Sequence, residues 1–212
     1  TRTQYDALSR PFRRIDDNGR VTETTYDRRG LVTQTRTEVV GADGTSHFLI
    51  SRTVYVADGR AIYATGSHRE DADPAEVTGT RTIYDEAGRV VRSEQLVGLQ
   101  IDLVDVVPTN SGAIAGTRLA DAGGVISFSA SVYDDEGRVA ETFNEYGLRT
   151  QTLYDRFGRV IESRSEVAPA TVDVTNDSGP PTADSSSWLV SRTIYDDRGM
   201  VIASTDRFLV PA

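Results

Sequence analysis

A short motif that recurs seven times constrains what this chain can fold into more than any other feature. In each copy, β-branched residues precede a tyrosine, and Asp-x-x-Gly-Arg-Val or a close variant follows it. The tyrosines of copies 1 to 7 are Tyr5, Tyr26, Tyr55, Tyr84, Tyr133, Tyr154 and Tyr195. They are 21, 29, 29, 49, 21 and 41 residues apart, so insertions fall between copies of a 21-residue unit. Such a unit cannot bury an apolar face alone and must stack on its neighbours.

A longer repetition lies above the first. Residues 36–40 and 48–55 (RTEVV, FLISRTVY) are echoed by residues 164–168 and 188–195 (RSEVA, WLVSRTIY). The offset is 128 residues for the first two tyrosines of each set and 140 for the third. We therefore treat residues 1–212 as a single repeat segment of seven motif copies with a superperiod of about four copies, and we expect it to be a fragment of a longer array.

Each copy is expected to form a strand, a tight turn and a second strand. Thr, Val and Ile before the tyrosine favour a pleated strand. Asp-x-x-Gly predicts a type I turn whose glycine is left-handed and whose aspartate accepts backbone N–H groups. The aspartates are Asp6, Asp27, Asp85, Asp134, Asp155 and Asp196, and the glycines are Gly30, Gly59, Gly88, Gly137, Gly158 and Gly199, with Ser9 in copy 1. In this register the aspartate faces the arginine four residues later, and the tyrosine faces the apolar residue six positions later.

Stacking of the copies should align the tyrosines in one aromatic row, which would bury much of each ring. The alternative is an exposed row that binds sugars. Phe48 and Trp188 occupy equivalent places in the longer repetition, and we expect Trp188 to anchor a hairpin.

Between copies, further turns are expected at residues 16–20, 41–44 and 144–148. We assign residues 98–124 and 169–187 to hairpin or loop insertions, and residues 68–76 to an acidic loop. The apolar run 99–107 is expected to pair with residues 125–128. No helical periodicity of useful length is present.

Composition excludes several classes of function. The net charge is −9, and all 23 basic residues are arginines without an aromatic-interleaved cluster, so nucleic acid and anionic lipid are not expected partners. No apolar run approaches the roughly 20 residues of a membrane span, so no membrane insertion is predicted. The absence of cysteine excludes disulfides, thiolate zinc sites and a cysteine nucleophile.

No catalytic, metal or cofactor site is predicted. His47 and His68 lack a nucleophile or carboxylate at a catalytic spacing. The acidic clusters at 134–136 and 196–197 could serve as acid and base or bind calcium, but they fall in the motif turn, where aspartate bonds the backbone. Residues 16–19 offer oxygen ligands without the other positions of a calcium loop. We therefore expect no enzyme and no cofactor.

The motif resembles the YD repeat of bacterial Rhs proteins, of the B/C subunits of insecticidal Tc toxins and of animal teneurins. The resemblance covers essentially the whole chain. It implies an all-β fold in which antiparallel hairpins form a spiralling strip, as in the family's hollow shells, and it implies that the motif tyrosines, aspartates and glycines named above are architectural. Bacterial shells of this family cleave themselves at Asp-Pro-x-Gly, but the Asp73-Pro74 step here lacks that glycine, so no autoprotease is expected.

The resemblance implies a non-catalytic structural scaffold within a secreted or cell-surface bacterial shell protein. The alternative is an extracellular adhesin or filament module that contacts carbohydrate or its own copies. The partners would be flanking repeats, copies of the chain, an encapsulated toxin domain or carbohydrate. Joining Ala212 to Thr1 of another copy would space their tyrosines by 22 residues, close to the basic unit.

Overall fold

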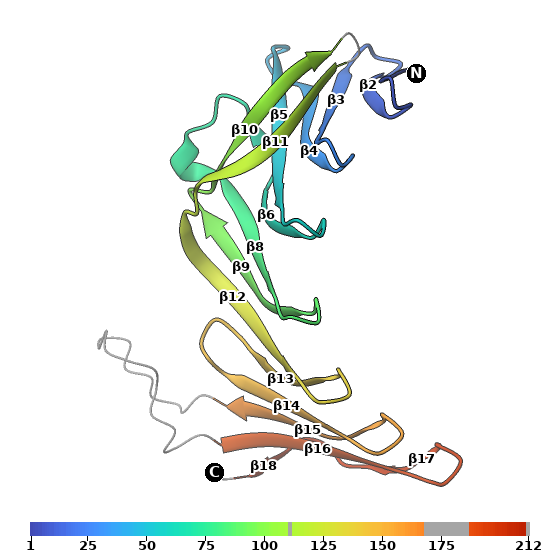
Figure 1. Cartoon of the computed structure of the whole chain (residues 1–212). Helices are drawn as coiled ribbons and strands as arrows, with labels where there is room; N and C mark the ends of the chain where they lie inside the picture. The colour runs from blue at the N-terminus through green and yellow to red at the C-terminus, as the bar shows by residue number, and fades with distance from the viewer. Residues whose placement is uncertain (110–111, 168–186, 211–212) are drawn as a thin grey trace, which may run out of the picture. The chain divides into compact units, whose positions relative to one another are not determined.

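The chain is built almost entirely of antiparallel β-strands (Figure 1). The computed structural model describes residues 1–109, 112–167 and 187–210. Within these ranges there is no α-helix, and the one helical element is the 3₁₀ turn η1 (Pro74–Glu76). No helix in the described part is long and apolar enough to cross a membrane. The expected all-β class is therefore confirmed, while all but the last residue of the 169–187 insertion lies outside the described residues.

Contacts divide the chain into two compact units. Unit 1 comprises residues 1–84 and 93–127, and unit 2 comprises residues 85–92 and 128–212. The strands of unit 1 are β1 (Arg2–Tyr5), β2 (Pro11–Ile15), β3 (Val21–Tyr26), β4 (Val32–Val40), β5 (Ser46–Tyr55), β6 (Ala61–Thr65), β7 (His68–Arg69), β8 (Thr78–Tyr84), β10 (Gln100–Thr109) and β11 (Gly112–Asp121). The strands of unit 2 are β13 (Val139–Phe143), β14 (Arg149–Tyr154), β15 (Val160–Val167), β16 (Ser187–Tyr195), β17 (Val201–Ser204) and β18 (Phe208–Val210), while β9 (Val90–Val97) and β12 (Gly124–Tyr133) have residues in both units.

The motif turn forms as its residues predict. Tyr26 pairs with Val32 and Tyr154 with Val160, six positions on in each copy. The six turn glycines have φ between 79° and 90°, a region that costs other residues free energy. Ser9 occupies the same conformation in copy 1, with φ of 60°.

Replacing Ser9 with glycine should therefore stabilise unit 1. We expect Ser9→Gly to raise the free energy of unfolding by about 1 kcal/mol, because it removes the penalty of a side chain in the left-handed region. Urea unfolding measures the change. Gly158→Ser is the matched reverse substitution and should lower stability by a similar amount; a Ser9→Gly variant no more stable than the parent would contradict this account of the turn.

The longer repetition is also present in the structure. Strands β2, β3 and β13, β14 have identical bounds after an offset of 128 residues. The long strand β5 pairs first with β4 and β7 and then with β6; β16 pairs in the same order with β15, β18 and β17. The 128- and 140-residue offsets thus reflect one structural module that occurs in each unit.

The predicted pairing of the apolar run 99–107 with residues 125–128 is wrong. Strand β10 pairs with β11 rather than with residues 125–128, which belong to β12. The sequence GAIAGTRLAD of β11 is poor in the large branched residues that favour strands, so its strand character was weaker than that of 125–128. Residues 68–76 are likewise no simple loop, since they contain β7 and η1.

The hairpin β10–β11 lies across the strands of unit 1 and completes the apolar core there (Figure 1). Leu99 is fully buried with Leu96 and Ile101, and Val54, Tyr63 and Leu119 pack against them. Gly79 permits this approach, because a Cβ at that position would lie 2.4 Å from Cδ2 of Leu99.

Side-chain hydrogen bonds fix the hairpin in place. The hydroxyl of the buried Thr33 donates to the carbonyl oxygen of Ala115 over 2.8 Å. The hydroxyl of Thr117 donates to the carbonyl oxygen of Thr53 over 2.7 Å. The insertion is therefore an integral layer of unit 1.

Candidate functional site

The tyrosine hydroxyls link each motif copy to the preceding one. In copies 2 to 7 the hydroxyl donates to the carbonyl oxygen of the residue six positions after the preceding tyrosine. The O···O distances lie between 2.8 and 3.2 Å for Tyr26 to Pro11, Tyr55 to Val32, Tyr84 to Ala61, Tyr133 to Val90, Tyr154 to Val139 and Tyr195 to Val160. One contact is thus repeated six times.

An arginine completes the same contact. The guanidinium of the arginine five positions after one tyrosine lies over the ring of the next tyrosine. Its carbon is 4.5 to 4.7 Å from the ring centroid for Arg10 over Tyr26, Arg60 over Tyr84, Arg89 over Tyr133, Arg138 over Tyr154 and Arg159 over Tyr195. We call this hydroxyl and guanidinium pair the copy-to-copy contact.

In copy 2 a different arginine contacts the next motif copy. It carries Leu31 where copies 1, 3, 4, 5 and 6 carry arginine; copy 7 has Met200 there. Arg29 instead donates from Nη1 to the carbonyl oxygens of Val56 and Ala57, over 2.7 and 3.1 Å, and from Nε to Asp27 over 2.8 Å. An arginine that is anchored on its own turn and reaches the next one is therefore present in this copy too.

This geometry differs from the expected row of stacked tyrosines. Guanidinium groups lie on the rings, and the tyrosines are partly exposed, with Tyr5 at 58%. From the sequence we predicted only that each arginine pairs with the aspartate of its own turn. The contact of that arginine with the tyrosine of the next copy depends on how the hairpins stack. The recurrence of arginine five positions after tyrosine was the signal that could have revealed it.

The turn aspartates hold these arginines in position. Asp155 accepts hydrogen bonds from the backbone N–H groups of Phe157 and Arg159 and pairs with the Arg159 guanidinium at 2.6 Å. Burial alone would raise the pKa of Asp155, but these backbone and guanidinium hydrogen bonds outweigh it and hold the pKa below its usual value. The pKa values of Asp6, Asp27, Asp85 and Asp134 are lowered in the same way.

The surroundings of the Tyr26 ring also shift the pKa of its phenol. Burial raises the pKa of Tyr26, and the Asp6 carboxylate adds to this, while Arg10 opposes it. The phenol therefore stays protonated at neutral pH and serves as a donor, as the bond to the Pro11 carbonyl requires.

Loss of one hydroxyl should weaken the contact measurably. Tyr154→Phe removes the 2.9 Å bond to the Val139 carbonyl and should lower the free energy of unfolding by about 1 kcal/mol. Tyr146, 73% exposed in a turn of the same unit, provides the control, since Tyr146→Phe should leave stability unchanged. Equal urea midpoints for the two variants would show that the hydroxyl bond contributes nothing.

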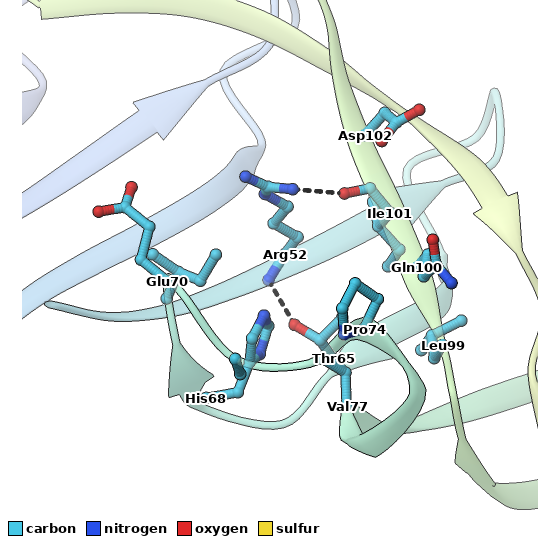
Figure 2. Close-up of a pocket in the computed structure, with 12 residues that line it drawn as sticks. Arg52, Thr65, His68, Glu70, Pro74, Val77, Leu99, Gln100, Ile101 and Asp102 are labelled. Atoms are coloured by element: carbon cyan, nitrogen blue, oxygen red, sulfur yellow. Dashed lines mark hydrogen bonds between the residues drawn. The ribbon is translucent and has the colours of Figure 1, made fainter.

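A cavity of about 180 Å³ lies in unit 1, beside the docked hairpin (Figure 2). Arg52 crosses it, donating from Nη1 to the Ile101 carbonyl over 2.7 Å and from its backbone N–H to Thr65 over 2.9 Å. The charged groups at its rim are paired elsewhere: Glu70 with Arg36 and Asp102 with Arg118. The cavity thus surrounds a structural link rather than a set of free reactive groups.

The histidines and acidic residues that the sequence offered as candidate site residues do not come together in one site. His68 lines this cavity with Nδ1 2.9 Å from the Gly66 carbonyl, while His47 lies on β5. Within the described ranges, no three histidine or acidic side chains gather as a metal site would require. Trp188 pairs with Glu166 as Phe48 pairs with Glu38, which confirms their equivalence.

Comparisons with known proteins identify the fold. No family model and no curated protein matches the sequence. Among solved structures, the chain is similar to "Crystal Structure of TcdB2-TccC3-Cdc42", with a TM-score of 0.55 and 14% identity over 98% of this chain and 9% of that one. It is also similar to "Crystal Structure of TcdB2-TccC3", with a TM-score of 0.50 and 14% identity over 95% of this chain and 11% of that one. The chain spans about a tenth of the length of these structures, and it has a Tc toxin-like β-fold.

Proposed function

We propose that this chain is a non-catalytic scaffold segment of a larger YD-repeat polypeptide of the Rhs and Tc toxin type. The observation that carries the proposal is the copy-to-copy contact, whose hydroxyl bond recurs in all six steps and whose guanidinium lies on the ring in five of them. The motif tyrosines of copies 2 to 7 and most motif arginines and aspartates are engaged in joining hairpins, so we assign the motif residues an architectural role. The fold shared with TcdB2-TccC3 supports a place in the wall of a shell.

The ionisation of the turn acids supports a role without catalysis. A general acid or base needs a pKa near the working pH. The lowered pKa values of Asp85 and Asp134 instead favour permanently charged acceptors of backbone and arginine hydrogen bonds. We further propose that the polypeptide is secreted or exposed on a bacterial surface, that its partners are flanking repeats and an enclosed toxin domain, and that no cofactor is needed.

The alternative is an adhesin or filament module. Exposed tyrosines could stack on sugars, but in five copies a guanidinium already covers one face of the ring. This arrangement leaves less aromatic surface for a carbohydrate and favours the scaffold.

Electron microscopy of the intact polypeptide that contains this chain tests the proposal. Hollow particles are expected for a shell wall. Fibres would support the filament alternative and contradict the shell. Saturable binding on a glycan array would favour the adhesin, and turnover in a hydrolase screen would overturn the assignment as a non-enzyme.

A further inference from the structure

One apolar position of the motif is covered in unit 1 and exposed in unit 2. The residue just before the tyrosine is apolar in copies 3 to 7. In unit 1, Val54 packs against the core that the β10–β11 hairpin completes. In unit 2 the equivalent side chains are 48%, 42% and 59% exposed at Val132, Leu153 and Ile194. Such a regular apolar row at a surface suggests a binding site.

The internal repetition relates these two surfaces residue by residue. In unit 1, Nε of Arg52 donates to Gln34 and the backbone N–H of Arg52 donates to Thr65. In unit 2, Arg192 pairs through Nε with Glu162, and its backbone N–H donates to Thr205 over 2.9 Å. The exposed face of unit 2 is thus the counterpart of the face that carries the hairpin in unit 1.

Unit 1 shows how this face binds a polypeptide. The Arg52 guanidinium donates to a backbone carbonyl of β10, at Ile101, over 2.7 Å. Leu99 and Ile101 then bury their side chains beside Val54. The face therefore recognises an extended strand through one carbonyl and alternate apolar side chains, with no requirement for a charged partner.

Unit 2 offers the same elements, and among its described residues no hairpin covers them. A groove of about 430 Å³ is lined by Leu153, Ile161 and Ile194 together with Arg192. The Arg192 side chain is 55% exposed; its Nε donates to Glu162, and its guanidinium carbon lies 5.6 Å from the centroid of the Phe208 ring. The other charged groups that line the groove are also paired: Arg164 with Glu162, and Asp155 with Arg159 at 2.6 Å.

We propose that this groove of unit 2 docks a β-hairpin of the β10–β11 kind. The occupant would be an extended segment with alternate apolar side chains, one of whose backbone carbonyls accepts a hydrogen bond from the Arg192 guanidinium. Ile194 would be covered as Val54 is in unit 1. The groove would therefore let the chain bind a further polypeptide segment. This inference does not depend on whether the chain is part of a shell.

A binding experiment with the whole chain tests this. A fluorescent peptide with the sequence of residues 98–124, closed into a hairpin, is titrated with the chain, and anisotropy is recorded. The unit 1 site is already filled by the chain's own hairpin, so binding should occur at unit 2. Ile194→Asp and Leu153→Asp should each weaken binding at least about tenfold, because they place a charge under the apolar contact.

Leu209→Asp is the matched control. Leu209 is 61% exposed in the same unit. Its neighbour Phe208 lies under the Arg192 guanidinium, on the face of the groove, so Leu209 points to the opposite face of the sheet. It should change binding less than about twofold. Hydrogen exchange should show peptide-dependent protection of β14 and β16.

Three results would overturn the proposal. One is the absence of saturable binding, and the second is an equal loss of binding in the Leu209→Asp and Ile194→Asp variants. The third is concentration-dependent self-association of the chain that Ile194→Asp abolishes, since the groove would then bind a second copy instead.

Discussion

Truncation of Leu99 to alanine should cost about 3 kcal/mol of unfolding free energy. Leu99 is fully buried at the centre of the core under the β10–β11 hairpin, in contact with Leu96 and Ile101. Gly79 leaves it room by bringing the β8 backbone close, so the cavity would be bordered by backbone that cannot easily collapse. The cost then includes both the lost transfer free energy and the empty space.

Urea unfolding followed by circular dichroism measures this effect. Val125→Ala provides the control, because Val125 is 52% exposed in the same unit and should change stability by less than about 0.5 kcal/mol. Limited proteolysis should also cut the β10–β11 hairpin faster in the Leu99→Ala variant. A cost below about 1 kcal/mol would show that the hairpin is not an integral part of the unit 1 core.

Acid should destabilise the chain through its turn aspartates. Their folded-state pKa values are lowered, so each one contributes stability that is fully present above its unfolded pKa, about 3.9, and is lost as pH falls through the folded value. Because the turn recurs along the chain, the losses accumulate. We expect similar urea midpoints at pH 7 and pH 5 and a steep decline below about pH 4.

Single variants assign the decline to the turns. Asp155→Asn should lower the midpoint at pH 7, and its difference from the parent should shrink as the pH falls below about 4. Asp135, an exposed acid one residue along a motif turn, provides the control: Asp135→Asn should leave the parent's pH profile unchanged. If both variants behaved alike, overall charge rather than the turn network would control acid stability.

The sequence was sufficient for the local structure. The positions of Asp134 and Gly137 determine a turn whose dihedral angles and register follow from backbone sterics and short-range hydrogen bonds. The equivalence of Phe48 and Trp188 followed from the longer repetition. These features depend on neighbours in the chain, which is why a pattern of residue types could predict them.

The contacts between distant segments were not accessible in this way. Nothing in the sequence indicated that Thr33 would donate to Ala115, 82 residues later, or that Leu99 would fill a site beside Gly79. The arginines that lie over five of the tyrosine rings were missed for the same reason, since this contact depends on the stacking of consecutive hairpins. Such contacts follow from tertiary packing, which a motif alone does not encode.

The copy-to-copy contact is tested most directly by a double-mutant cycle between Arg10 and Tyr26. The Arg10 side chain is 17% exposed, and its guanidinium carbon lies 4.5 Å from the Tyr26 ring centroid. The free energies of unfolding of the parent, Arg10→Met, Tyr26→Leu and the double variant give the coupling between the copies. We expect a favourable coupling of about 0.5 to 1 kcal/mol, whereas additive effects within about 0.3 kcal/mol would contradict the claim that arginine and tyrosine join successive hairpins.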